Sequence, residues 1–343
     1  MNNYIENNSF NFNQISKSRD FLFGLSIFFV VFHHLTINFT DGYLGKTYTY
    51  FHYMGAVGVD IFLFLSAIGL YYSYSKNEDT IVFYKRRFLR IFPAFFIIVI
   101  PWFFYYDIMK KGDYAWFFGH ITSIGYWFKG SGDWFISAIL LLYLLYPLLY
   151  KYLYKTNIKY AILRLFFLYG VLILYLKYFF PDYTPSLGQF LPRIPIFLTG
   201  MFIAPYVKNG LYLPRIKTII LSLITLITFM GLYLILALKG SGAVYCFIGR
   251  LIFLPISISL VFVIANLYKE TSNLFTEFIV FIGSLSLEIY LTNERTIAIS
   301  ESLGKYYGFN QDYFSIVIEN LIGIVSCVIL SYLVHRLTNK KEI

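Results

Sequence analysis

Residues 21–39 read FLFGLSIFFVVFHHLTINF, an apolar run without a single Asp, Glu, Lys or Arg. A helix needs about 20 residues of this kind to cross the hydrocarbon core of a bilayer. Two adjacent histidines, His33 and His34, interrupt the run near its far end. We therefore expect a membrane-spanning helix that carries two titratable side chains.

The composition of the whole chain agrees with this first run. Of its 343 residues, 58% are hydrophobic and only 13% are charged, and the mean hydropathy is +0.65. A soluble domain carries about 25% charged residues, which it needs to cover its surface. A soluble globular protein, a disordered chain and a coiled coil are therefore excluded. The expected fold class is an all-α polytopic membrane protein.

Apolar runs predict a bundle of about ten transmembrane helices. We expect one membrane-embedded domain over residues 1–343, with a polar segment at 1–18 and a basic tail at 336–343, both cytoplasmic. The predicted spans are residues 21–39, 55–74, 91–106, 134–150, 160–179, 194–207, 218–238, 244–267, 277–293 and 314–335.

The net charge of +10 is explained by membrane topology rather than by nucleic-acid binding. With the N-terminus inside, most of the 28 Lys and Arg residues fall in cytoplasmic loops, as the positive-inside rule requires. This asymmetry favours an even number of spans with both termini in the cytoplasm. The first run is not followed by a convincing signal-peptide cleavage site, so we expect a retained helix.

Ionisable groups inside a membrane are costly and are therefore candidates for function. His34 lies about five residues, or roughly 8 Å, from the outer end of the first span, and Asp60 lies at a similar depth in the second. We expect His34 to act as a general base, with Asp60 orienting and stabilising its ring. The alternatives are a histidine bonded to a backbone carbonyl and an aspartate that caps a broken helix.

A basic cluster, FYKRRFLRIFP at residues 83–93, lies at the predicted cytoplasmic mouth. Arg86 and Arg90 are spaced i, i+4 and share a helical face, with Arg87 between them. Guanidinium groups bind phosphate in a bidentate manner, and Pro93 is suited to the start of a helix, whose N-terminus favours anions. The sequence predicts a phosphate site here, although an ordinary positive-inside loop would look similar.

Four more residues are candidates for substrate binding, although each has a structural explanation when taken singly. The first two lie where spans meet the outer surface, and the other two lie in the ninth span. They are Trp134, Arg193, Glu288 and Tyr290.

Taken together and in this order, these segments resemble the acyltransferase-3 family of bacterial integral membrane acyltransferases. The resemblance covers about residues 17–300. It is carried by SRDFLFGLSIFFVVFHH, GVDIFLFLSAIGLYYS and FYKRRFLRIFP, and later by WFISAILLLYLLYPLLY and GSLSLEIYL.

The resemblance implies transfer of an acyl group, most often acetyl, from cytoplasmic acyl-coenzyme A to a hydroxyl of a cell-envelope or exported polysaccharide. The histidine that the family requires falls on His34, and Arg86, Arg87 and Arg90 would hold the coenzyme phosphates. The expected location is the bacterial cytoplasmic membrane. Acetyl-coenzyme A is the expected donor, no metal is expected, and an acetyl-histidine intermediate stays open.

The expected partners are a glycan or lipid-linked saccharide as acceptor and the surrounding membrane lipids. A second copy of the chain, or a separate protein that accepts the acyl group, is compatible with the sequence. Nucleic acid is not expected.

The chain departs from the family pattern at two positions. Phe23 stands where many members have an arginine, eleven residues before the histidine, and Arg19 is the nearest substitute. Thr292 and Asn293 follow the late YL pair, where a histidine is common.

A rival function is that of a transporter or flippase for a lipid-linked sugar or another solute, because buried charges and broken helices also mark transporters. We see no repeated hydropathy pattern that relates two halves of the chain. Binding of coenzyme A separates the two functions, since a sugar flippase has no use for it.

Overall fold

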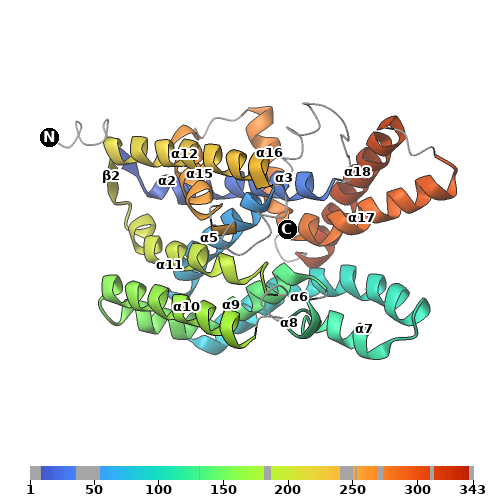
Figure 1. The fold of residues 1–343 in the computed structure, drawn as a ribbon, viewed down its shortest axis with the longest axis horizontal. Helices are drawn as coiled ribbons and strands as arrows, with labels where there is room; N and C mark the ends of the chain where they lie inside the picture. The colour runs from blue at the N-terminus through green and yellow to red at the C-terminus, as the bar shows by residue number, and fades with distance from the viewer. Residues whose placement is uncertain are drawn as a thin grey trace. The chain divides into compact units, whose positions relative to one another are not determined.

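The computed structural model describes residues 9–35, 55–130, 132–180, 187–239, 250–251, 253–268, 273–309 and 313–339. Helices account for most of these residues, and two short strands pair beside them (Figure 1). The elements are β1 (Ser9–Asn11), α2 (Asn13–Lys17), α3 (Arg19–His34), α5 (Ala56–Tyr74), α6 (Thr80–Phe103), the π-helix η1 (Phe104–Met109), α7 (Tyr114–Ile121), α8 (Gly125–Lys129), α9 (Trp134–Tyr154), α10 (Ile158–Phe179), the 3-10 helix η2 (Leu191–Arg193), α11 (Ile194–Lys208), β2 (Tyr212–Pro214), α12 (Arg215–Lys239), α15 (Phe253–Leu267), α16 (Leu274–Ser284), α17 (Ser286–Tyr306) and α18 (Tyr313–Thr338).

Each predicted span overlaps a helix of the structure, and the prediction of a helical membrane protein is confirmed. By length and composition, five helical stretches among the described residues can cross a membrane. A sixth results if α16 and α17, which meet at an angle of 80°, count as one broken span. The five stretches are Ala56–Tyr74, Thr80–Met109, Trp134–Tyr154, Ile158–Phe179 and Phe314–Thr338. A count of ten spans is not established by the helices alone.

The third span differs most from its prediction. Helix α6 begins at Thr80, because Asp79 caps it by accepting hydrogen bonds from the backbone N–H groups of Ile81 (2.8 Å) and Val82 (3.0 Å). Pro93 lies inside this helix rather than at its start. The basic cluster is therefore helical throughout, and the predicted anion-binding helix terminus at Pro93 is wrong.

The chain forms two compact units, and unit 1 consists of Met1–Arg19, Asp60–Arg87 and Thr122–Glu270. Its core is rich in buried aromatic side chains from α5, α6 and α9. The ring of Tyr74 lies 5.2 Å from that of Phe83 and 4.9 Å from that of Tyr150, in edge-to-face arrangements that aromatic quadrupoles favour.

The N-terminal segment of unit 1, expected to be merely polar, is folded where the structure describes it. Strand β1 pairs antiparallel with β2, with Phe10 opposite Leu213. Phe10, Phe12 and Ile15 are almost completely buried. The described part of this segment is therefore anchored by apolar residues scattered among its asparagines. The last four residues of the predicted basic tail, 340–343, and the first eight residues, 1–8, lie outside the described residues.

Unit 2 consists of Asp20–Val59, Phe88–Ile121 and Thr271–Ile343. Its helices approach one another closely at glycines, as is common between membrane helices. A side chain at Gly283 of α16 would collide with the backbone carbonyl of Asp20 on α3, and one at Gly58 of α5 would collide with that of Ser26. These contacts fix the first half of α3 against both neighbours, and Gly55 lies against His33 near the end of that helix.

Candidate functional site

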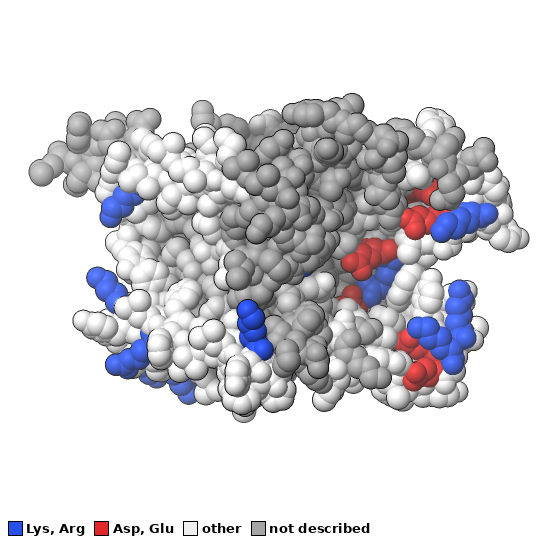
Figure 2. Space-filling model, viewed as in Figure 1, with Lys and Arg blue, Asp and Glu red and all other residues white. Residues whose placement is uncertain are grey.

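His34 is the last residue of α3, and the structure pairs it with Glu294 of α17. Its Nε2 lies 2.7 Å from Oε1 of the glutamate. The histidine side chain is 21% exposed and the glutamate side chain 64%, so the pair is accessible from outside unit 2. On the face shown in Figure 2, acidic side chains gather beside basic ones at the edge that carries α7, α17 and α18 in Figure 1.

The two nitrogen atoms of His34 have different surroundings. A carboxylate only accepts hydrogen bonds, so Glu294 favours the ring tautomer that carries its proton on Nε2. The other nitrogen, Nδ1, is buried and has no hydrogen-bond partner among the described residues. Its lone pair is then free to take a proton. A carboxylate that orients an imidazole whose second nitrogen is basic is the arrangement on which general-base catalysis depends.

Arg295 follows Glu294 in α17 and is buried against aromatic residues of α6. Its guanidinium carbon lies 5.8 Å from the ring centres of both Trp102 and Phe103. The Phe103 ring in turn stacks on that of His120, at 4.0 Å between centres. His120 Nδ1 lies 2.6 Å from Oδ2 of Asp107, on the π-helix that extends α6. Arg295, the rings of Phe103 and His120, and Asp107 therefore form one continuous row of contacts in unit 2.

Asp60 belongs to unit 1 and His34 to unit 2, and inside its own unit Asp60 has polar partners. Asp60, 5% exposed, has its Oδ1 3.1 Å from Nε of Arg193 and accepts a hydrogen bond from Ser257 at 3.4 Å.

In unit 1, Asp60 and two other predicted site residues form one cluster. Arg193 lies at the end of η2, just before α11, and Trp134 is the first residue of α9. The Arg193 guanidinium carbon lies 4.6 Å from the centre of the Trp134 ring, while its Nε faces Asp60. Arginine is suited to this double role because its flat guanidinium can stack and form ion pairs at once.

The three arginines of the basic cluster have different exposures. Arg86 and Arg90 are exposed on one face of α6, as their spacing predicts. Arg87 is partly buried, with its guanidinium carbon 5.6 Å from the centre of the Phe83 ring. The structure thus leaves two guanidinium groups accessible to a ligand.

Glu288 and Tyr290 do not join the histidine pair. Glu288 is buried in α17, where its Oε1 lies 3.0 Å from Nδ1 of His335 on α18. It lies six residues, or about 9 Å along the helix, before Glu294. Tyr290 is partly buried, and its backbone carbonyl accepts a hydrogen bond from Asn293 at 2.7 Å.

Glu294 was not among the predicted site residues. The predicted ninth span ends at residue 293, so this carboxylate directly after the span was not counted as a charge within a helix. In the structure, α17 runs on to Tyr306. The described residues contain no group of three or more His, Cys, Asp or Glu side chains that could hold a metal ion.

No curated protein and no solved structure matches the chain. The family model described as "Acyltransferase domain" matches residues 19–336, a range that includes both the His34–Glu294 pair and the arginines of α6. The chain therefore belongs to the acyltransferase-3 family of membrane acyltransferases.

Proposed function

We propose that the protein transfers an acyl group from acyl-coenzyme A to a hydroxyl group of a cell-envelope or exported polysaccharide. The observation that carries the proposal is the His34–Glu294 pair, with its exposed carboxylate and with an Nδ1 that has no hydrogen-bond partner in the described part of the chain. A sugar hydroxyl is a weak nucleophile and needs a base to remove its proton as it attacks. In this proposal His34 is the base that removes this proton.

In the proposed reaction, Nδ1 of His34 takes the proton of the acceptor hydroxyl while its oxygen attacks the thioester carbonyl carbon. The new carbon–oxygen bond forms, the carbon–sulfur bond breaks, and the coenzyme leaves as a thiolate. The imidazolium then returns the proton to that thiolate, giving free coenzyme A and an acyl ester. Glu294 stabilises the positive charge of the ring between the two proton transfers.

The remaining site residues are assigned by their chemistry. Arg86 and Arg90, which are exposed, bind the phosphates of the donor at the cytoplasmic face, and Arg87 supports them. Trp134 offers an aromatic face for the acceptor, held in position by Arg193, whose charge Asp60 balances. In this scheme the chain has ten spans and both termini in the cytoplasm of a bacterial cell.

The proposal is tested with purified protein in liposomes and acetyl-coenzyme A labelled on the acetyl group. The expected result is release of free coenzyme A with a matching gain of label in an added envelope glycan. Failure to bind any acyl-coenzyme A, together with movement of a lipid-linked saccharide across the membrane, would replace the transferase with a transporter.

A further inference from the structure

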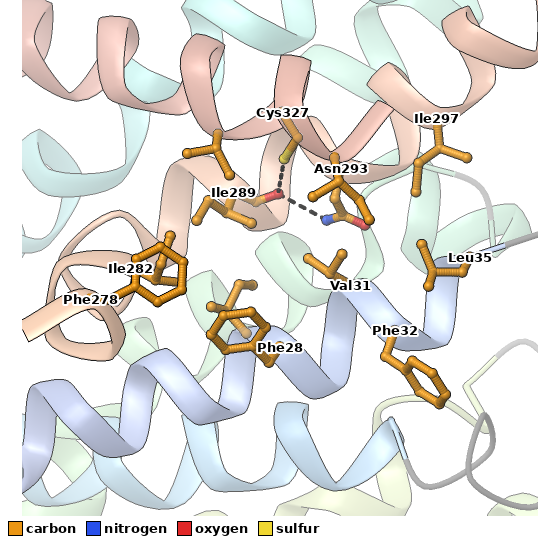
Figure 3. Close-up of a pocket in the computed structure, with 13 residues that line it drawn as sticks. Phe28, Val31, Phe32, Leu35, Phe278, Ile282, Ile289, Asn293, Ile297 and Cys327 are labelled. Atoms are coloured by element: carbon orange, nitrogen blue, oxygen red, sulfur yellow. Dashed lines mark hydrogen bonds between the residues drawn. The ribbon is translucent and has the colours of Figure 1, made fainter. Parts of the chain in front are cut away.

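A partly open cavity of about 220 Å³ lies in unit 2, among α3, α16, α17 and α18 (Figure 3). Almost all of its lining is apolar. The lining includes Phe28, Val31, Leu35, Asn293 and Val328. An enclosed apolar cavity of about 150 Å³ in another protein has room for benzene, so the volume here is sufficient for a short hydrocarbon chain.

One polar atom in this lining lacks a partner. Asn293 is 1% exposed, and its Nδ2 donates hydrogen bonds to the backbone carbonyls of Ile289 (2.9 Å) and Tyr290 (2.7 Å). Its Oδ1 is buried and has no hydrogen-bond partner among the described residues. Figure 3 shows this side chain among the apolar residues, with a dashed line from its nitrogen to Ile289. Because an unsatisfied buried acceptor is costly, an occupant that donates a hydrogen bond there would be favoured.

The cavity adjoins the histidine pair on both helices that carry it. Val31 of α3 and Leu35, the residue after its last turn, line the cavity on either side of His34 in sequence. Asn293 immediately precedes Glu294 on α17. A thioester whose carbonyl carbon is attacked beside His34 therefore has an apolar space within about one helical turn for the rest of its acyl group.

We propose that this cavity binds the acyl chain of the donor, and that the preferred acyl group is longer than acetyl and carries a hydroxyl close to its carbonyl carbon. The hydrocarbon fills the apolar lining, and the hydroxyl donates a hydrogen bond to Oδ1 of Asn293. The proposal rests on the proposed function, since it concerns the donor of that same reaction.

The test measures kcat/KM for three donors, the acetyl, butyryl and 3-hydroxybutyryl thioesters of coenzyme A. Butyryl is expected to exceed acetyl by about 15-fold, which corresponds to the roughly 1.6 kcal/mol gained by burying two methylene groups. The 3-hydroxybutyryl donor is expected to exceed butyryl by a further factor of about 2 to 10, from one hydrogen bond.

Two variants examine the two parts of the proposal. Asn293→Leu removes the acceptor, so the ratio of 3-hydroxybutyryl to butyryl is expected to fall below one. Val328→Phe fills the cavity from α18, so the ratio of butyryl to acetyl is expected to fall to about one or lower. Val325→Phe is the matched control: it makes the same change on the same helix, at a side chain that is 57% exposed and does not line the cavity. It should preserve both ratios.

The outcomes separate this inference from the function on which it rests. If the wild type transfers acetyl at least as well as both longer groups, the cavity does not select the donor, and the inference is wrong while the transferase function stands. Equal ratios in Val328→Phe and the wild type would contradict it as well. If none of the three donors is consumed, the proposed function itself fails.

Discussion

The two ring nitrogens of His34 differ: Nε2 contacts Glu294, and Nδ1, which has no hydrogen-bond partner in the described ranges, is the proposed base. In a serine protease, replacing the carboxylate that orients the catalytic histidine by an amide costs about 10⁴-fold in kcat, because the ring takes the wrong tautomer. Glu294→Gln is therefore expected to lower kcat at least tenfold with little change in donor binding. Turnover and donor binding measured on the same preparation would check this. A rise in the donor Kd without a fall in kcat would assign Glu294 to binding instead.

The Asp60–Arg193 pair is expected to matter for stability. Both side chains are at most 7% exposed, and removing one partner of a buried ion pair costs about 3–5 kcal/mol because the other charge stays buried and unpaired. Asp60→Asn should lower the thermal midpoint markedly, and the double variant Asp60→Asn/Arg193→Gln should recover most of the loss. A double-mutant cycle in detergent measures the coupling. Additive losses would mean that the two side chains do not depend on each other.

At the scale of the helix, α6 presents Arg86 and Arg90 on one exposed face. Hydrogen bonds to charged groups are worth about 1.5–3 kcal/mol, so Arg86→Ala/Arg90→Ala should weaken donor binding by about 10- to 100-fold. The difference in donor affinity between the two proteins should shrink at high salt, because salt screening also weakens donor binding by the wild type. Arg86→Lys/Arg90→Lys keeps the positive charges but loses the planar guanidinium groups, so its donor affinity should lie between those of the wild type and the alanine variant. Unchanged affinity in the alanine variant would move the donor site away from α6.

The contact of α5 with α3 depends on the absence of a side chain at Gly58, whose added Cβ would meet the backbone of Ser26. Gly58→Ala is expected to push α3 outwards and to lower both the thermal midpoint and transfer. Gly170→Ala in α10 is the matched control, because no atom lies within 4 Å of the added methyl group. There, alanine should be neutral or stabilising by up to about 1 kcal/mol. Equal effects of the two changes would contradict the packing argument.

The helices could be predicted from hydropathy because every span has to bury its own backbone hydrogen bonds. The predicted start of the third span was wrong because proline occurs in two different positions of a helix. Pro93 marks a helix start in one context and is tolerated inside a helix in another. The Asp79 cap earlier in the chain is what sets the true start of α6.

The contacts between site residues were harder to predict than the identity of those residues. His34 and Asp60 were recognisable as charges in apolar runs, yet their partners, Glu294 and Arg193, lie 260 and 133 residues away along the chain. Which helix faces meet depends on small residues such as Gly58, whose contacts cannot be read from a single sequence. Trp134 and Arg193 were both predicted, but their stacking was not.

For the whole molecule, the orientation of the long helix Thr80–Met109 tests the proposed topology. At about 45 Å it is longer than the hydrocarbon core, so we expect its ends to emerge on opposite sides of the membrane. Starting from a variant without Cys246 and Cys327, Lys111→Cys should react with an impermeant thiol reagent in intact cells. Lys76→Cys should react only after the membrane is opened. The reverse pattern would place the arginines of α6 outside the cell.

The central claim is that His34 acts as the base of an acyl transfer, and its most direct test compares His34→Gln with His33→Gln. The second variant is the matched control, since it changes the neighbouring histidine on the same helix turn. Both are followed for acyl-coenzyme A binding and for transfer of labelled acetyl to the glycan in one liposome preparation. We predict that His34→Gln binds the donor normally and loses 10²- to 10⁴-fold in transfer, the range that general-base catalysis supplies. Near-normal transfer by His34→Gln would contradict the account.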